Sequence, residues 1–418
     1  MEPASFLIEH ADVIATCRGP APKRGPSQGA LVRLGDSVIA AHEGRIVFVG
    51  PQSALADHAN LLRSTVRIDA TGCTVLPGFV DAHTHLVYAG DRLEELQRRL
   101  AGASYTEIAA AGGGIARTVA ATREASEDAL IALGRARLDQ MAACGTTTCE
   151  TKSGYGLTVE SELRQLRVIS TLDAIHPVDI APTFLGAHAV PDEFRGRPDD
   201  YVSLVIGDMI PRVAADSLAE WCDVFCEAGA FTADQSAAIL LAALNAGLKP
   251  RIHANELGPS GGVEVAARVG ARAADHVIFV DQRGADALAA ANVCAVLLPI
   301  AALYLKLGRY APARMLIDRG VPVALGTDLN PGAGLSPSMP FAIALAAFAM
   351  GMTLDEALVA ATLNAAWAID RADSVGSLER GKLMDAVIVE GDASNLVRVG
   401  VPSIRMVIKR GEVIFRAQ

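Results

Sequence analysis

Short apolar runs alternate with long Ala- and Leu-rich stretches through the middle of the chain. An apolar run between turn residues is typical of a buried strand, and the longer stretches have the composition of helices. We predict eight strands, at residues 75–80, 146–150, 180–185, 223–226, 250–252, around 274, 293–298 and 321–325. Helices are predicted between them, the clearest at 124–143, 233–246 and 354–369.

Eight strands that alternate with helices predict an α/β fold of the (β/α)₈ class, the TIM barrel. The alternative is a doubly wound open sheet. That fold often carries a Gly-x-Gly-x-x-Gly turn after its first strand, and none follows residues 75–80 here.

The two ends of the chain have a different pattern, with shorter apolar runs broken by glycine and proline. These runs predict strands at 6–8, 13–15, 37–41 and 45–49, and again at 386–389, 406–408 and 413–415. We expect both ends to complete one small β-sandwich, with the barrel inserted between them. The predicted division is 1–66 and 376–418 for the sandwich and 67–375 for the barrel.

Composition excludes several classes of protein. The formal charge is −10 and no basic run is present, which argues against binding to nucleic acid or to an anionic membrane. The longest apolar tract, 341–350, is too short to cross a bilayer, and residues 1–5 do not resemble a secretory signal. The seven cysteines show no framework spacing, so we expect reduced thiols and a cytoplasmic location.

Histidines gather at the predicted strand ends. His83 and His85 follow the first strand as His-Thr-His, and residues two apart on an extended chain point to the same side. Of the nine histidines, three more fall at strand ends: His188, His253 and His276. A single strand-end histidine is most often structural. Five on one rim of a barrel indicate a metal site, because the carboxyl ends of the strands meet there.

A carboxylate after the last predicted strand completes a ligand set. With His83, His85 and His253, Asp328 gives three imidazoles and one acid, a set that suits zinc and leaves room for water. The fourth strand ends in Cys226-Glu227 and offers no lysine that could bridge a second ion, so one metal is favoured.

Two further residues are candidates for catalysis. Glu256, three positions after His253, is placed to move a proton to or from water. His276 is placed to orient Asp328 or the water. Each has a structural alternative: a solvated loop glutamate and a buried core histidine.

Several segments together resemble the amidohydrolase superfamily and, within it, the imidazolonepropionase branch of histidine breakdown. The superfamily features are Pro77–His85 with its two histidines, the strand-five histidine and the strand-eight aspartate. The more specific segments are His85–Arg92, Gly102–Tyr105, Gly112–Ile115, Lys152–Leu157, Phe184–His188, Asp223–Glu227 and Asp328–Gly332. They extend over almost the whole predicted barrel in the expected order.

The resemblance implies a role for each matching residue. One zinc or iron ion would be held by His83, His85, His253 and Asp328. Substrate contacts would come from Arg92, Tyr155, His188, Glu256, Asn330 and Gly332, and from the backbone at Ala333, where relatives usually have Ser or Thr. The catalytic residues would be Glu256, His276, Asp328 and His188. A homodimer is also implied.

The implied reaction opens the ring amide of 4-imidazolone-5-propanoate to give N-formimidoyl-L-glutamate. That substrate needs donors for its propionate, and Arg92, Tyr155 and backbone N–H groups near Gly332 could supply them. The alternatives are hydrolysis of another small cyclic amide, deamination of a heterocycle, and an inactive barrel kept as a scaffold.

Overall fold

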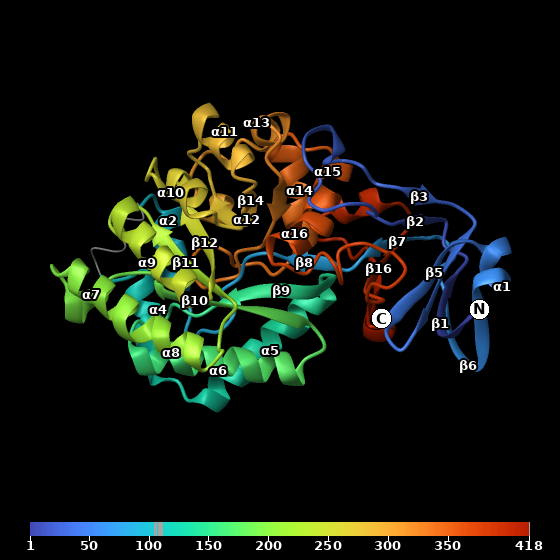
Figure 1. The fold of residues 1–418 in the computed structure, drawn as a ribbon, viewed down its shortest axis with the longest axis horizontal. Coiled ribbons are helices and arrows are strands. Elements are labelled where there is room, and N and C mark those ends of the chain that lie inside the picture. The colour runs from blue at the N-terminus through green and yellow to red at the C-terminus, as the bar shows by residue number, and fades with distance from the viewer. Residues whose placement is uncertain (104–106, 108–111, 418) are drawn as a thin grey trace.

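The computed structural model describes residues 1–103, 107 and 112–417 of the 418-residue chain. Tyr105 of the Gly102–Tyr105 segment therefore lies outside the described residues. Figure 1 shows two parts: a barrel wrapped by helices, and a pair of sheets beside it that hold both ends of the chain.

The larger part is a parallel barrel of eight strands in the order β8-β9-β10-β11-β12-β13-β14-β15. The strands are β8 Phe79–Asp81, β9 Thr146–Lys152, β10 Asp179–Ala187, β11 Trp221–Cys226, β12 Lys249–Ala254, β13 Ala273–His276, β14 Cys294–Leu297 and β15 Val323–Leu325. Beyond the strand ends, the N–H of His85 donates to the carbonyl of Leu329 (2.9 Å) and that of Asp328 to the carbonyl of His83 (3.0 Å). These bonds bring the first and last strands together, so the predicted barrel is confirmed.

Helices follow most strands and cover the outside of the barrel (Figure 1). They are α2 Leu93–Leu100, α4 Ile115–Glu124, α5 Glu127–Ala143, α6 Val159–Ile175, α7 Pro198–Leu204, α8 Ile210–Ala215, α9 Ala233–Asn245, α10 Gly262–Val269, α11 Gln282–Ala290, α12 Pro299–Tyr304, α13 Ala313–Asp318, α14 Met339–Met350, α15 Leu354–Ala360 and α16 Leu363–Ala368. Most of them pack apolar faces against the strands in one large core, and the buried alanines of α16 join a second cluster with residues of β8, β14 and β15.

The smaller part is a sandwich of two sheets, in the orders β5-β4-β1-β6 and β18-β17-β16-β7-β2-β3. Its strands are β1 Glu2–Glu9, β2 Val13–Ala15, β3 Arg33–Leu34, β4 Ser37–His42, β5 Arg45–Pro51, β6 Ala59–Asp69, β7 Cys73–Pro77, β16 Ala386–Glu390, β17 Ile404–Lys409 and β18 Glu412–Arg416. Phe6 and Ile39 from one sheet share a buried cluster with Val75 and Ile388 from the other. The two chain ends therefore form one small β-sandwich, as expected.

The prediction of a single strand over 75–80 is wrong. Residues 75–77 belong to β7 of the sandwich and only Phe79–Asp81 enters the barrel. Gly78 separates the two, and a Cβ there would lie 2.3 Å from the Oγ1 of Thr147. Sheet membership therefore changes at Gly78, and the division of the chain into two domains stays a proposal.

Two predicted helices are each interrupted. The predicted helix at 124–143 begins only at Glu127, because Ser126 caps α5 by accepting the N–H of Ala129. The predicted helix at 354–369 is divided into α15 and α16 at Thr362, whose hydroxyl donates to the carbonyl of Leu358 (2.6 Å).

A buried lysine joins the two parts of the structure. Lys409 of β17 is 2 % exposed, and its ammonium lies 2.7 Å from carboxylate oxygens of both Asp385 and Asp179. Asp179 begins the barrel strand β10, so this charged contact ties the sandwich to the barrel wall.

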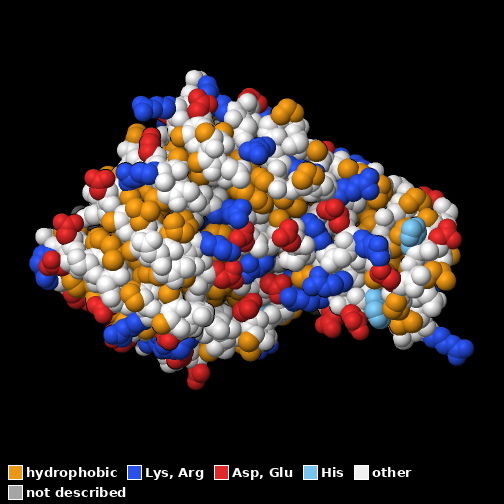
Figure 2. All heavy atoms as spheres, in the orientation of Figure 1, with side chains coloured by type: hydrophobic (Ala, Val, Ile, Leu, Met, Phe, Trp, Pro, Cys, Tyr) orange, Lys and Arg blue, Asp and Glu red, His pale blue; other side chains and the backbone are white. Residues whose placement is uncertain are grey.

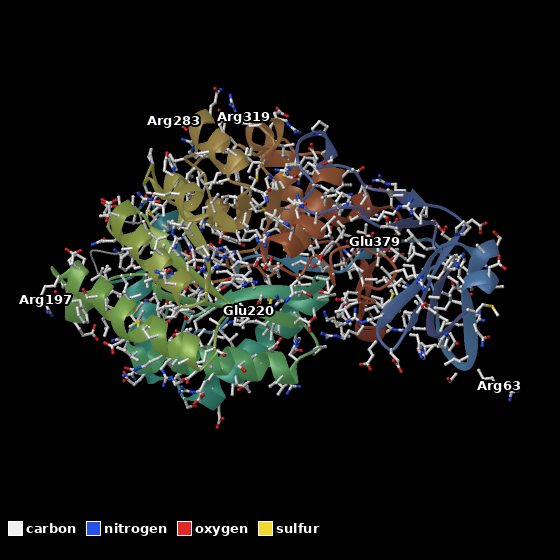
Figure 3. The ribbon with its side chains drawn as sticks, viewed as in Figure 1. Arg63, Arg197, Glu220, Arg283, Arg319 and Glu379 are labelled. Atoms are coloured by element: carbon white, nitrogen blue, oxygen red, sulfur yellow. The ribbon has the colours of Figure 1, made fainter. Side chains whose placement is uncertain are left out.

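The outer surface carries charges of both signs, interspersed over the face seen in Figure 2. Figure 3 labels Arg197, Arg283 and Arg319 on the outside of the barrel and Arg63 at the tip of the sandwich. Among the described residues, no helix combines the length and apolarity needed to cross a membrane.

Candidate active site

Three predicted ligands meet at the carboxyl ends of the barrel strands. His83 and His85 follow β8, and His253 lies in β12. One ring nitrogen of each histidine lies within 4.8 Å of a ring nitrogen of each of the other two. The Nε2 atoms of His83 and His85 are 3.2 Å apart. All three side chains are buried.

Asp328 joins this cluster. Its Oδ1 lies 3.5 Å from the Nε2 of His83 and 3.5 Å from that of His85. Asp328 has a φ of 54°, a left-handed conformation that few residues other than glycine adopt and in which Asp and Asn are enriched. The structure therefore brings together all four residues predicted to hold the metal.

The donor set fits a divalent cation. His83 donates its Nδ1 proton to Asp275 (2.7 Å), so in the neutral ring its Nε2 carries the lone pair. That nitrogen faces the Nε2 of His85 and an Asp328 oxygen that has no hydrogen-bond partner among the described atoms. Burial raises the pKa of Asp328 to about 7, so a positive charge nearby would favour its ionised form. A cation bound by three nitrogens and this oxygen satisfies all of these groups.

A layer of buried charges lies beneath the ligands. Asp275 holds His83, and Asp223 lies 3.0 Å from the Nδ1 of His253, so each carboxylate orients one ligand. Lys152 lies 3.0 Å from Asp223, and Arg251 donates to Asp275 (2.8 Å). All four of these charged side chains are completely buried.

This layer was not predicted. A signal was present: aspartate occurs inside β11 and β13, whose other residues are largely apolar, and charged residues are seldom buried unless they are paired. Which acid pairs with which base depends on contacts between different strands, and no local pattern shows that.

One cavity contains the predicted substrate residues and opens onto the ligands. Its lining includes His85, Arg92, Tyr155, His188, His253, Glu256, His276, Asp328, Asn330, Gly332 and Ala333. Phe225, Ile115, Leu257 and Leu305 supply apolar walls that were not predicted. The ligand His83 lies below them, 0 % exposed.

Arg92 is held in place at one side of this cavity. Its Nε donates to Glu95 (2.7 Å), and both side chains are buried. A Cβ added to Gly332 would lie 2.2 Å from an Arg92 Nη, so the guanidinium rests against the Gly332 backbone. Only glycine at position 332 allows that approach.

The expected use of backbone N–H groups near Gly332 as substrate donors is not what the structure shows. The N–H groups of Gly332 and Ala333 both donate to Oδ1 of Asn330, at 2.8 Å and 2.7 Å. Asn330 therefore stabilises the conformation of this loop through hydrogen bonds within it. Arg92 is left as the cationic donor beside the cavity.

Glu256 and His276 lie side by side, with 3.6 Å between Oε1 and Nδ1. Burial, and then the nearby Asp328 and Glu227 carboxylates, raise the pKa of Glu256 well above its usual range. Glu227 fixes the segment by accepting the N–H groups of Glu256 and Leu257, each at 2.9 Å. Glu256 is thus a buried acid whose surroundings favour its protonated form.

His188 stacks on His85, with 5.1 Å between ring centroids. Its Nδ1 donates to the carbonyl of Gly154 (2.9 Å), which leaves Nε2 as an acceptor in the neutral ring. Burial, and then the neighbouring His253, lower the pKa of His188 to about 3.

Comparison with known proteins supports the site's chemistry. The amidohydrolase family profile matches residues 74–414. Imidazolonepropionase of Geobacillus kaustophilus is 51 % identical, over 98 % of this chain and 97 % of its own. Imidazolonepropionase of Clostridium tetani is 43 % identical, over 100 % and 99 %.

Solved structures support the same fold at lower identity. A zinc-bound adenosine deaminase from Xanthomonas campestris has a TM-score of 0.68 at 19 % identity, covering 99 % of this chain and 93 % of its own. A triazine hydrolase variant has a TM-score of 0.74 at 18 % identity, covering 98 % and 94 %. The family match and the curated relatives confirm the resemblance seen in the sequence, and the chain is a hydrolase that belongs to the amidohydrolase family and, within it, to the imidazolonepropionases.

Proposed function

We propose that this enzyme hydrolyses the ring amide C–N bond of 4-imidazolone-5-propanoate and releases N-formimidoyl-L-glutamate. One observation carries the proposal: Arg92, a receptor for a carboxylate, lines the same cavity as the buried histidine cluster and Glu256. The substrate combines a ring carbonyl with a propionate, and these two groups match the two ends of that cavity. The names of the curated relatives support the same reaction.

We assign the metal ligands to His83, His85, His253 and Asp328, and we propose a single Zn²⁺, with iron as the alternative. When bound there, the ion would acidify a water molecule and polarise the ring carbonyl. A second ion is not favoured, because Lys152, the lysine nearest the cluster, is already in ion pairs with Glu150 and Asp223.

The substrate contacts follow from the cavity lining. A guanidinium binds a planar carboxylate with parallel hydrogen bonds, so Arg92 holds the propionate while Glu95 fixes its Nε edge. Tyr155 and His188 contact one another, with 5.2 Å between ring centroids, and both line the cavity, so together they offer one aromatic wall for the ring of the substrate. Asn330 keeps the loop at Gly332 and Ala333 in shape.

Proton transfer is assigned to Glu256, with Asp328 and His276 beside it. During hydrolysis, water adds to the ring carbonyl carbon, the C–N bond breaks, and the leaving nitrogen takes a proton. An acid whose pKa lies above its usual range donates that proton most readily near neutral pH, and Glu256 is such an acid. His276 lies directly beside it, with 3.6 Å between its Nδ1 and the Oε1 of Glu256, and is the candidate relay.

The direct test is to incubate purified, metal-loaded protein with 4-imidazolone-5-propanoate and to follow the loss of the ring chromophore. Formation of N-formimidoyl-L-glutamate without ammonia is expected. Release of ammonia from a panel of aminated heterocycles, with no ring opening, would favour the deaminase alternative. If the protein opens only other cyclic amides, the proposed substrate is wrong and the reaction class still holds.

Metal content separates the ligand assignment from activity. The variant His253→Ala should lose bound metal, measured by elemental analysis, because it removes one of three clustered imidazoles. His176→Ala is the matched control, since His176 is also buried but pairs with Asp139 away from the cavity. Retention of stoichiometric metal by His253→Ala would contradict the assignment.

Two expectations from the sequence stay predictions. The homodimer is tested by light scattering of the purified protein. The cytoplasmic location agrees with seven free thiols, none in a disulfide.

A further inference from the structure

The loop between β9 and α6 forms part of the cavity wall. It runs from Ser153 to Leu157, and its Tyr155 lines the cavity. The carbonyl of Gly154 accepts the Nδ1 proton of His188 (2.9 Å). One loop therefore presents an aromatic side chain and, through its backbone, sets the orientation of a histidine on the neighbouring strand.

A buried carboxylate holds this loop. Glu162, in the first turn of α6, is 0 % exposed and accepts three backbone N–H groups of the loop. The donors are Gly154 (3.0 Å), Gly156 (2.8 Å) and Leu157 (2.7 Å). Burial raises the pKa of Glu162, and hydrogen bonds from Ser153 and from these amides oppose that rise.

The loop lies tightly against its surroundings. A Cβ at Gly156 would lie 2.6 Å from the backbone nitrogen of Glu162, and one at Gly154 would lie 3.0 Å from the Nδ1 of His188. Gly154 also has a φ of 109°, which side chains rarely allow. A shift of the loop by a few tenths of an ångström is therefore transmitted directly to His188.

Gln165, one turn further along α6, supports the same loop. Its Oε1 accepts the N–H of Tyr155 (3.0 Å), and its Nε2 donates to the carbonyl of Val87 (2.8 Å). Val87 follows the ligand His85 by two residues, so Gln165 joins the β9 loop to the segment that carries two metal ligands.

Capping of the helix does not account for Glu162. Thr158 is the N-cap of α6, and its hydroxyl accepts the N–H of Ser161 (3.2 Å). The Glu162 carboxylate bonds to the loop ahead of the cap instead. The position of Glu162 is explained by the loop that it binds, because this loop carries Tyr155 and its Gly154 carbonyl bonds to His188.

We propose that Glu162 is a positioning residue for the reaction: by binding three loop amides it fixes Tyr155 and, through the Gly154 carbonyl, His188 in the geometry that receives the substrate ring. Gln165 acts on the same loop through Tyr155. This inference rests on the proposed function for the identity of the substrate, and on hydrogen bonds alone for the placement of His188.

The test compares Glu162→Gln and Glu162→Ala with the wild-type enzyme. Glutamine keeps an acceptor for Gly156 and Leu157 but turns an amide NH₂ toward the N–H of Gly154, so Gly154 loses its acceptor and its carbonyl, the partner of His188, is held less firmly. We expect kcat/KM to fall about tenfold to a hundredfold in Glu162→Gln, and further in Glu162→Ala, because small misplacements of positioned groups have effects of that size. Bound metal should remain at the wild-type level.

A spectroscopic measurement reports the geometry directly. In protein with ¹⁵N-labelled histidine, the Nδ1–H signal of His188 should be protected from exchange in the wild type and should shift or broaden in Glu162→Gln. The matched control is Glu356→Gln, another nearly buried glutamate in a first helical turn, which accepts the N–H of Thr353 (2.8 Å) away from the cavity. This control should lose stability but keep kcat/KM and the His188 signal.

The outcomes separate the two proposals. If Glu162→Gln loses stability as Glu356→Gln does while keeping kcat/KM and the His188 signal, the positioning role is wrong. If Glu162→Gln does not fold, Gln165→Ala, which removes the acceptor for the Tyr155 N–H and the donor to the Val87 carbonyl, should show the same effects at smaller size, and unchanged kinetics would overturn the inference. Failure of the wild type to open 4-imidazolone-5-propanoate would reject the proposed function, and the His188 signal would still decide the role of Glu162.

Discussion

The buried charges beneath the ligands make a quantitative prediction about Lys152. Its ammonium lies 2.7 Å from Glu150, 3.0 Å from Asp223 and 3.8 Å from Asp275, and all of these side chains are 0 % exposed. With Arg251, the cluster has three carboxylates and two cations, a formal charge of −1. The variant Lys152→Met changes that charge to −2 without leaving a large cavity.

The size of the effect follows from these distances. At an effective dielectric constant of about 20, the three attractions sum to roughly 16 kcal/mol. Most of this gain offsets the desolvation of the ammonium, so removing one partner of such a cluster costs about 3–5 kcal/mol of net stability. We therefore expect the free energy of unfolding of Lys152→Met to fall by about that amount.

The assay is equilibrium denaturation of chelator-treated protein, so that metal binding does not contribute to the measured stability. The double variant Lys152→Met/Glu150→Gln restores the formal charge to −1 and should recover at least about 1 kcal/mol of the loss. Lys306→Met, at an exposed lysine, is the control and should change stability by less than about 0.5 kcal/mol. A loss below 1 kcal/mol in Lys152→Met, or no recovery in the double variant, would refute the reasoning.

Three further predictions concern other parts of the molecule. In Gly334→Ala the new Cβ would lie 1.6 Å from the Asp328 carbonyl oxygen, so the variant should lose bound metal in elemental analysis, whereas Gly35→Ala, with open space around it, should keep it. Lys409→Met should lose about 3–5 kcal/mol in denaturation at pH 8, and a loss under 1 kcal/mol would contradict a buried ion pair. Burial already raises the pKa of Asp385, so in Lys409→Met the unpaired carboxyl should take a proton as the pH falls. The loss of stability should therefore be smaller at pH 5 than at pH 8. A loss that does not change with pH would exclude the unpaired carboxylate as its cause. Removal of the metal with a chelator should lower the melting temperature, and re-addition of zinc should restore it, because a ligand bound only by the folded state stabilises it.

Some features of the site could be predicted because they depend only on local pattern. Alternation of side chains along an extended chain places His83 and His85 on one side, and apolar runs mark where strands end. In a parallel barrel those ends share one rim, so residues such as His253 and Asp328 converge although they are far apart in sequence. The convergence of the candidate ligands at one rim of the barrel followed from these two rules.

Other features depend on contacts that no local pattern contains. Val75 lies in an apolar run that suits either sheet, and its pairing with β16 and β2 places it in the sandwich. The N–H groups at Gly332 could have faced the cavity, but Asn330 accepts them because the loop folds back on itself.

By itself, the sequence determined which residues stand at the strand ends and hence the barrel and the histidine cluster, since these depend on spacing along the chain, while its matching segments carried the resemblance to the family. Tertiary structure alone decided which carboxylate orients each imidazole, that Lys152 lies beneath the ligands and that Glu162 holds the loop at Tyr155. The physical reason is that buried charges and amides take partners according to distance in space, and those distances are set by the packing of strands and helices far apart in the sequence.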